Sequence, residues 1–448
     1  MVLLPIFFYS DATAFPGWAA VVPTLGTGLI LGSGPSVWLN RVVLSWKPVV
    51  YVGLISYPLY LWHWPLLSIA QIETLDQAST MLRFGMVLLS FVLAAATYTY
   101  VERPVRRSAM STCPILLLVG CVAALGVAGL AAEPLRSRLQ PPNGMLGADQ
   151  LRWDYLNNQP CTSKFEPADG PPWLTCVANS AAPSILVLGD SHANHLYPGL
   201  VSQEALASRG VVSFGAGGPM FGVYSVGVGS TPEQIRAAIR QKAWQDEILL
   251  HVSAKMPSVR YVILSSRWPS FTASGAFADH FTGRPEPRFY FSIDPSGQRL
   301  SQEALFSQGL ELTISVLEKQ NIAVILFLDT PFPSYDVRRC MDRPYFKARE
   351  TCSVDRNEMR TARASFTKVV ERLRPRHPHL LVYDPFPVFC NAKSCSFVSK
   401  TDVFLRDDEH LSVAGSRAVA AHFAAWASAA IPDLLRGQGG GRRGPDLR

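Results

Sequence analysis

Three residues whose types suit nucleophilic catalysis lie at two distant points of the chain. Ser191 lies in the block Gly-Asp-Ser-His, which directly follows an apolar run, and Asp407 and His410 are three residues apart near the far end of the chain. A serine hydroxyl is a weak nucleophile near neutral pH and needs a base that takes its proton. An Asp at this spacing can hold one imidazole nitrogen and leave the other for the serine. We therefore predict a triad of Ser191, His410 and Asp407.

Each motif also has a simpler interpretation. Ser191 on its own would be a helix N-cap, because serine side chains commonly accept the first free backbone N–H groups. Asp408 and Glu409 are either solvated surface residues or alternative carboxylates for orienting the imidazole. The spacing favours Asp407, and the presence of both motifs in one chain favours the catalytic interpretation over the cap.

The elements around these motifs follow a repeating order. Short apolar runs alternate with longer amphipathic segments, including 231–256 and 301–320, and an Ala-rich helix is expected at 413–430. This alternation indicates a parallel sheet covered by helices on both faces, with its site at the carboxyl ends of the strands. We predict a three-layer α/β domain with strands at 184–188, 211–214, 261–264, 323–328 and 380–383.

A Gly-Asp-Ser block that opens a domain and an Asp-x-x-His motif that closes it resemble the SGNH/GDSL hydrolase superfamily, over about residues 180–432. The resemblance implies a flavodoxin-like α/β fold and an oxyanion hole that uses a Gly after the second strand. Gly217 and Gly218 are the candidates, although glycine here is equally compatible with a plain turn. The superfamily's Asn is missing, because Ser265-Ser266-Arg267-Trp268 follows the third strand. Arg267 is then an oxyanion donor, a ligand for an anionic glycan, or a structural salt-bridge residue.

The first third of the chain is strongly apolar. A spanning helix needs about 20 mostly apolar residues, and the stretches 18–34, 49–70, 81–101 and 112–132 are the candidates. Basic residues lie in the loops after the first and third stretches, whereas the loop 71–80 carries Glu73 and Asp76 and no Lys or Arg. Basic loops face the cytoplasm, so we expect four spans and an extracytoplasmic, periplasmic C-terminal part anchored in the inner membrane.

The segment 53–65 carries Ser56, Tyr57, Tyr60 and His63 within Ser-Tyr-Pro-Leu-Tyr-Leu-Trp-His-Trp-Pro. An interfacial aromatic belt is one interpretation, and an intramembrane His is also a functional-site candidate. Together with Tyr-Thr-Tyr-Val-Glu-Arg-Pro at 98–104, the segment resembles the acyltransferase family 3 membrane proteins. The resemblance covers about residues 12–105 and only the last helices of that family, so a truncated membrane domain is expected, with a separate chain as a possible source of the rest.

Six cysteines in the second part form neighbouring pairs along the chain. Such pairs fit disulfides in an oxidising compartment better than buried thiols, and no spacing suits zinc. We predict the disulfides Cys161–Cys176, Cys340–Cys352 and Cys390–Cys395. The expected organisation is a membrane domain at 1–133, a linker and disulfide-bearing entry segment at 134–179, an SGNH domain at 180–435 and a disordered basic tail at 436–448.

The net charge of +7 arises largely from residues beside the apolar stretches and in the tail, which argues against nucleic-acid binding. No Walker-type loop or dinucleotide fingerprint is present, so no bound nucleotide or metal is expected. The order of membrane segment, linker and SGNH domain resembles fused polysaccharide O-acetyltransferases. This resemblance implies O-acyl transfer to an envelope polysaccharide with acetyl-CoA as the ultimate donor. The alternatives are a periplasmic esterase or deacetylase and an inactive glycan-binding remnant.

Overall fold

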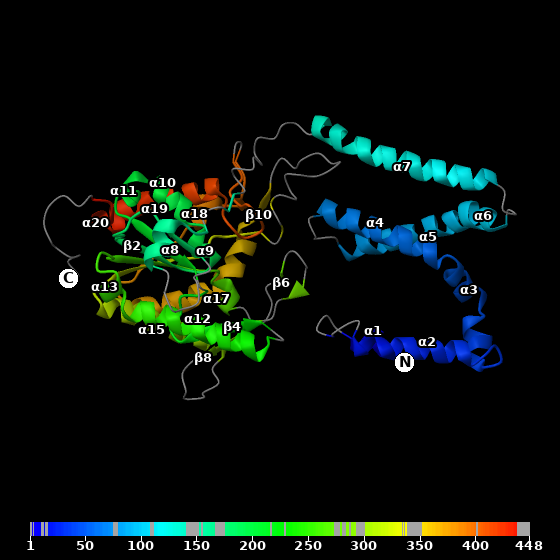
Figure 1. The fold of residues 1–448 in the computed structure, drawn as a ribbon, viewed down its shortest axis with the longest axis horizontal. Coiled ribbons are helices and arrows are strands. Elements are labelled where there is room, and N and C mark those ends of the chain that lie inside the picture. Colours follow the sequence, from blue (N-terminus) through cyan, green and yellow to red (C-terminus); the bar gives the residue numbers. More distant parts are fainter. Residues whose placement is uncertain are drawn as a thin grey trace. The chain divides into compact units, whose positions relative to one another are not determined.

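The computed structural model of the chain (Figure 1) forms two compact units, Met1–Leu139 and Gln140–Arg448, and each is described by itself. The structure describes residues 2, 4–9, 13, 17–74, 79–107, 112–139, 152–153, 156–165, 175–215, 217–227, 230–272, 278–279, 284–285, 288–292, 301–333, 335, 337, 352–399 and 402–436. The predicted tail beyond residue 436 lies outside these ranges.

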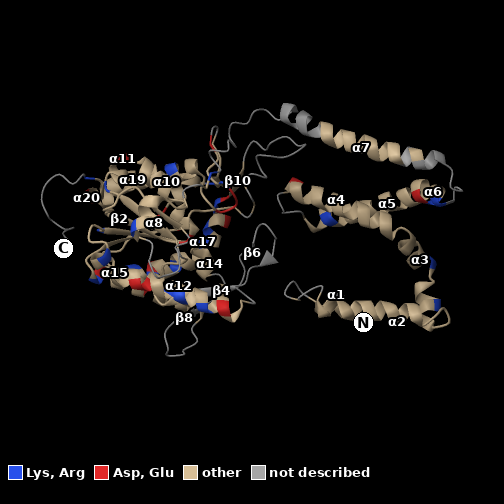
Figure 2. Cartoon of the chain, viewed as in Figure 1, with Lys and Arg blue, Asp and Glu red and all other residues tan. Residues whose placement is uncertain are grey.

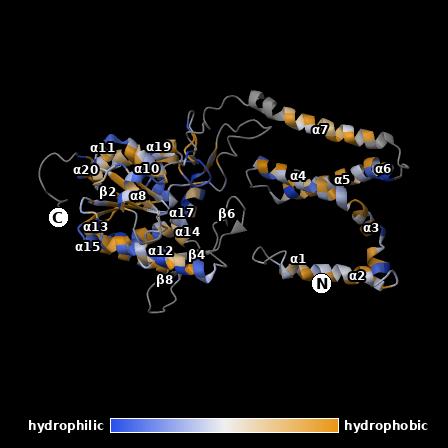
Figure 3. Ribbon diagram, in the orientation of Figure 1, coloured by the Kyte–Doolittle hydropathy of each residue, from blue (hydrophilic) through white to orange (hydrophobic). Residues whose placement is uncertain are grey.

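The described residues of the first unit form helices joined by short turns, with no strand among them. Its helices are rich in apolar side chains and carry few charges (Figures 2 and 3). They are α1 (Leu4–Phe8), η1 (Trp18–Ala20), α2 (Val21–Gly32), η2 (Leu39–Leu44), α3 (Lys47–Leu54), α4 (Ser56–Thr74), α5 (Thr80–Thr97), η3 (Tyr98–Glu102), α6 (Arg103–Arg107) and α7 (Thr112–Leu139).

One helical stretch of the described residues, Thr80–Arg106, is long and apolar enough to cross a membrane. It contains the third predicted span. The second predicted span is divided, because α3 ends at Leu54 and Ile55 leaves the helical conformation before α4 begins at Ser56. Trp18–Gly32 and Val119–Ala131 are apolar but shorter than a full span. Four spans therefore remain a prediction.

The second unit is built on a six-stranded sheet in the order β1-β3-β2-β5-β9-β11. The five predicted strands are present and run parallel, which confirms the α/β prediction. Their side chains are nearly all buried because helices cover both faces. The bounds are β1 (Thr175–Ala178), β2 (Ile185–Gly189), β3 (Val211–Gly215), β5 (Tyr261–Ser265), β9 (Ala323–Phe327) and β11 (Leu381–Tyr383).

Helices lie on both sides of this sheet in Figure 1, with α10, α11 and α19 on one side and α12 and α15 on the other. The helices are α8 (Gln159–Phe165), α9 (Ser191–Asn194), α10 (Tyr197–Ser202), α11 (Glu204–Ala207), α12 (Pro232–Leu250), α13 (Val252–Lys255), α14 (Pro269–Thr272), α15 (Gln302–Lys319), α17 (Arg356–Leu373), η5 (Arg374–Arg376), α18 (Phe386–Phe389), α19 (Val413–Ala430) and α20 (Pro432–Leu435). Three small antiparallel pairs complete the unit: β4 (Val223–Gly227) with β8 (Arg288–Ser292), β6 (Ala278–Asp279) with β7 (Arg284–Pro285), and β10 (Ser353–Asp355) with β12 (Ser394–Ser396).

Strand β1 lies within the predicted linker and disulfide-bearing entry segment 134–179. It pairs antiparallel with β3 at the edge of the sheet, with Cys176 opposite Phe214. The disulfide Cys161–Cys176 ties α8 to this strand, and Cys390–Cys395 closes a short loop, so two predicted disulfides are confirmed. Cys352 is also disulfide-bonded, while its predicted partner Cys340 lies outside the described residues.

Candidate active site

Ser191 lies at the start of α9, directly after the buried strand β2. The N-cap of α9 is Asp190, whose Oδ1 accepts a hydrogen bond from the backbone N–H of His192 at 2.8 Å. The cap interpretation of Ser191 is therefore wrong, and its hydroxyl is left for another role. Gly189 is required just before this turn, because a Cβ there would lie 1.6 Å from the carbonyl oxygen of Ser265 on the neighbouring strand.

The structure brings Ser191, His410 and Asp407 together, although 219 residues separate the serine from the histidine. Ser191 Oγ lies 2.8 Å from His410 Nε2, and His410 Nδ1 lies 3.0 Å from Asp407 Oδ2. With its proton on Nδ1, facing the carboxylate, the imidazole presents an unprotonated Nε2 to the serine hydroxyl. This is the arrangement that activates a serine for attack on a carbonyl carbon.

The pairing of two helices explains how these distant residues meet. Helix α10 follows Ser191 and helix α19 follows His410, and the two pack closely through Gly199 and Ser416. Ser416 Oγ accepts a hydrogen bond from the backbone N–H of Gly199 at 2.8 Å. A Cβ on Gly199 would lie 2.0 Å from the backbone oxygen of Ser416. The absence of a side chain at this position thus sets the distance between the serine and histidine segments.

Asp407 is held as an anion. Burial acts to raise its pKa, but the hydrogen bond and charge of His410, with the backbone N–H groups of His410 and Glu409, outweigh burial and lower the pKa of Asp407 well below its usual range. Its Oδ1 accepts from these two N–H groups at 2.6 and 3.0 Å. The loop geometry therefore orients the carboxylate before any substrate is present, as a positioned general-base system requires.

The proposed oxyanion residues follow strands adjacent to β2. Gly189 is in register with Gly215 on β3 and with Ser265 on β5, so the segments after all three strands emerge at one edge of the sheet. Gly217 and Gly218 follow β3, and Gly217 has a left-handed φ of 107° that favours glycine. Their location agrees with the predicted oxyanion loop and equally with a plain turn.

The loop after β5 is attached to the serine block through Asp190. The second carboxylate oxygen of Asp190 accepts from the hydroxyl of Ser266 and from the backbone N–H of Arg267, the latter at 3.0 Å. The side chain of Arg267 pairs with Glu409 at 2.6 Å. Glu409 is consequently an ion-pair partner rather than a solvated surface residue, and Arg267 joins the β5 loop to the His410 loop.

A buried His–Asp pair that the sequence analysis missed lies next to the triad. His192 is fully buried, its Nδ1 lies 2.8 Å from Asp329 Oδ1, and its ring centroid is 5.3 Å from that of His410. Burial lowers the pKa of His192, but the charge and hydrogen bond of Asp329 outweigh burial and raise it to about 9. The available sequence signal was weak: His192 follows the nucleophile candidate, and Asp329 follows a predicted strand at the same sheet edge.

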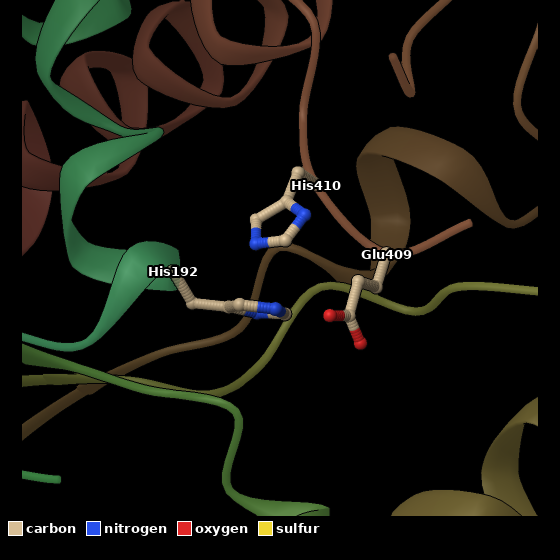
Figure 4. Close-up of side chains that lie close together, drawn as sticks. All are labelled: His192, Glu409 and His410. Carbon is tan, nitrogen blue, oxygen red and sulfur yellow. The ribbon is translucent and has the colours of Figure 1, made fainter. Parts of the chain in front are cut away.

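His192, Glu409 and His410 converge in Figure 4, and each offers a nitrogen or oxygen atom within 4.8 Å of the others. His195 packs behind them, with its ring centroid 4.8 Å from that of His192. Burial is the main cause that lowers the pKa of His195, and its Nδ1 accepts a hydrogen bond from the backbone N–H of Leu411 at 3.3 Å. His195 thus holds the backbone of the loop that carries His410.

The four residues of the predicted membrane motif lie at the start of α4, in the first unit. Ser56 Oγ donates to the carbonyl of Gly53 at 2.8 Å, and His63 Nδ1 lies 2.8 Å from the carbonyl oxygen of Tyr60. The rings of Tyr60 and His63 are neighbours, at 5.6 Å between centroids. Tyr57 and Tyr60 are exposed within this unit.

The second unit is an α/β domain whose sheet is parallel except for β1, with Ser191 directly after a strand and hydrogen-bonded to His410. Residues 160–425 match the family model described as "SGNH domain (fused to AT3 domains)", and the chain belongs to this family. The resemblance to an SGNH domain fused to an acyltransferase family 3 membrane segment, predicted from the two motifs and the membrane segment, is thereby confirmed.

Several curated proteins are similar to part of the chain. A putative membrane-bound transacylase, BcsY, of Komagataeibacter xylinus is 32% identical over 96 residues, which are 21% of this chain and 24% of that protein. The peptidoglycan O-acetyltransferase OatA of Listeria monocytogenes is 27% identical over 96 residues, 21% of this chain and 15% of that protein. A putative peptidoglycan O-acetyltransferase, YrhL, of Bacillus subtilis is 30% identical over 73 residues, 16% of this chain and 11% of that protein. The chain thus matches less than a quarter of the length of each.

Among solved structures, the periplasmic domain of a lipopolysaccharide acetyltransferase from Salmonella ser. Paratyphi A is similar at 14% sequence identity. The similarity covers 54% of this chain and 82% of that domain, with a TM-score of 0.36.

Proposed function

We propose that this protein is a membrane-anchored O-acyltransferase that transfers an acyl group, acetyl in the first instance, to a hydroxyl of an envelope polysaccharide. The observation that carries the proposal is the chain of hydrogen bonds from Ser191 through His410 to Asp407. The family and the printed names of the relatives support acyl transfer as the class of reaction. The helix Thr80–Arg106 supports membrane attachment.

The first half of the proposed reaction forms an acyl-enzyme. Ser191 Oγ attacks the carbonyl carbon of the acyl donor while His410 Nε2 takes the hydroxyl proton, and Asp407 stabilises the resulting imidazolium. The donor's leaving group departs with that proton. Gly217, Gly218 and Arg267 are the proposed sources of donors for the tetrahedral oxyanion, and one such donor is worth about 2.7–4 kcal/mol of transition-state stabilisation.

The second half transfers the acyl group to its acceptor. A sugar hydroxyl gives its proton to His410 Nε2 and attacks the acyl carbon, the Ser191 ester bond breaks, and the proton returns to Ser191 Oγ. If water takes the place of the sugar, the same residues perform ester hydrolysis. Acetyl-CoA is the proposed ultimate acyl donor.

The test uses the full chain in detergent micelles with an activated acetyl ester, with and without envelope glycan. We expect acetyl groups on the glycan by mass spectrometry. The variant Ser191→Ala should lose about 10⁴-fold or more of this activity, with an unchanged unfolding temperature. Free acetate alone, dependent on Ser191, would replace the transferase by an esterase. Full activity of Ser191→Ala would refute the triad.

A further inference from the structure

Trp153 is a solvent-exposed aromatic side chain of the second unit. Among the described residues after 139, the exposed large hydrophobic side chains are Trp153, Leu250 and Leu312, and Trp153 is the aromatic one, at 39% exposure. Aromatic rings contribute much to binding where they remain partly open to solvent. Trp153 precedes the SGNH sheet and lies within the predicted linker and disulfide-bearing entry segment 134–179.

The indole of Trp153 lies beside the predicted catalytic base. Its ring centroid is 5.1 Å from that of His410, with 44° between the ring planes. Its Nε1–H donates to Asn194 Oδ1 at 3.2 Å, on the short helix that begins with Ser191. The guanidinium carbon of Arg406, a buried residue, lies 3.3 Å from the ring centroid. The ring is therefore held at one edge and on one face.

The surroundings of the ring indicate which chemistry it would bind. An aromatic face carries partial negative charge and attracts the weakly positive C–H groups of a pyranose ring, whose hydroxyls need polar neighbours. Asn194 and Arg406 place polar groups at one edge and on one face of Trp153. An alkyl chain of an acyl donor would instead require an apolar lining. The setting suits a sugar better than a lipid chain.

We propose that Trp153 is the platform on which the acceptor sugar stacks, so that one of its hydroxyls lies at His410 Nε2. This inference rests on the proposed acyltransferase function and names the substrate class of its second half. Holding the sugar in place raises the local concentration of its hydroxyl over water, which favours transfer over hydrolysis of the acyl-enzyme. Trp153 is thus a specificity-determining residue contributed by the entry segment.

The experiment compares Trp153→Ala, Trp153→Phe and the exposed-surface control Leu312→Ala in the full chain. With an activated acetyl ester and a soluble envelope oligosaccharide, we expect the acceptor KM of Trp153→Ala to rise about tenfold, equivalent to about 1.4 kcal/mol. This rise should exceed any change in the rate of acylation by the ester. Trp153→Phe should recover most of the acceptor affinity, and Leu312→Ala should behave as the wild type.

Three results would overturn the platform. An unchanged acceptor KM in Trp153→Ala is one, and a parallel fall in acylation and transfer, which indicates a structural role, is another. The third is weakened binding of long-chain acyl esters in place of glycans. Calorimetry then compares oligosaccharide binding to Ser191→Ala and to the double variant Ser191→Ala/Trp153→Ala. Neither variant can form the acyl-enzyme, so this measurement tests the platform separately from the proposed function. Binding that depends on Trp153 supports the platform even if no transfer occurs, and absent binding refutes it.

Discussion

At the scale of single residues, Asp407 fixes which nitrogen of His410 carries the proton. The variant Asp407→Asn keeps the size of the side chain but removes its charge and allows the wrong imidazole tautomer. We expect the turnover number to fall by about 10⁴-fold, with ester binding little changed. Steady-state kinetics with an activated ester measures this effect, and a fall of less than tenfold would show that another carboxylate orients the imidazole.

Asp407 also predicts a dependence of stability on acid. Because the folded protein lowers the pKa of Asp407, the carboxylate stabilises the fold above its unfolded pKa of about 3.9, and this contribution is lost as the pH falls below that value. The difference in unfolding free energy between the wild type and Asp407→Asn should be constant near neutral pH and shrink in acid. A difference that grows on acidification would contradict the assigned direction of the pKa.

His192 predicts the opposite dependence on pH. Its folded pKa of about 9 lies above the usual histidine value of 6.5, so its contribution to stability is complete below the unfolded pKa and is lost as the pH rises through the folded one. Relative to His192→Gln, the wild type should lose stability across this interval. Denaturant unfolding at several pH values measures the loss, and a flat difference would show that the imidazole is neutral throughout.

At the scale of elements, the contact between α10 and α19 sets the distance from Ser191 to His410. Gly199→Ala would place a methyl group against the backbone of Ser416 and push the two helices apart. Overpacking of this kind costs about 1–3 kcal/mol. We expect a lowered unfolding temperature. We also expect the rate of fluorophosphonate labelling at Ser191 to fall at least tenfold, because the serine is moved away from His410. Leu312→Ala is the control. Labelling of Gly199→Ala at the wild-type rate would show that this helix contact does not set the distance from Ser191 to His410.

At the scale of the whole molecule, the disulfides and the apolar first unit make a common prediction. Cys161–Cys176 and Cys390–Cys395 would persist only in an oxidising compartment, and basic loops favour the cytoplasm. Two reporter enzymes can be fused after residue 436. A reporter that is active only after export should therefore be active, and a reporter that is active only in the cytoplasm should be inactive. Alkylation of unreduced protein from cells should leave all four cysteines unmodified. The reverse reporter pattern with free thiols would place the domain inside the cell.

The sequence by itself determined the features that depend on local pattern. Apolar runs and amphipathic periods predicted the five parallel strands, and the short spacing of cysteines predicted two disulfides that the structure contains. The Gly-Asp-Ser block and the Asp-x-x-His motif selected Ser191, Asp407 and His410, because a serine nucleophile needs a base and that base needs an orienting carboxylate.

Only the tertiary structure decided the contacts that connect distant segments. The pairing of Arg267 with Glu409, the buried pair of His192 and Asp329, the edge position of β1, and the location of Trp153 against His410 have no local signature. The physical reason is that periodicity and motif spacing are properties of a few consecutive residues. Which polar side chains become partners across the sheet edge depends instead on how closely the strands and helices pack, as Gly189 and Gly199 show here.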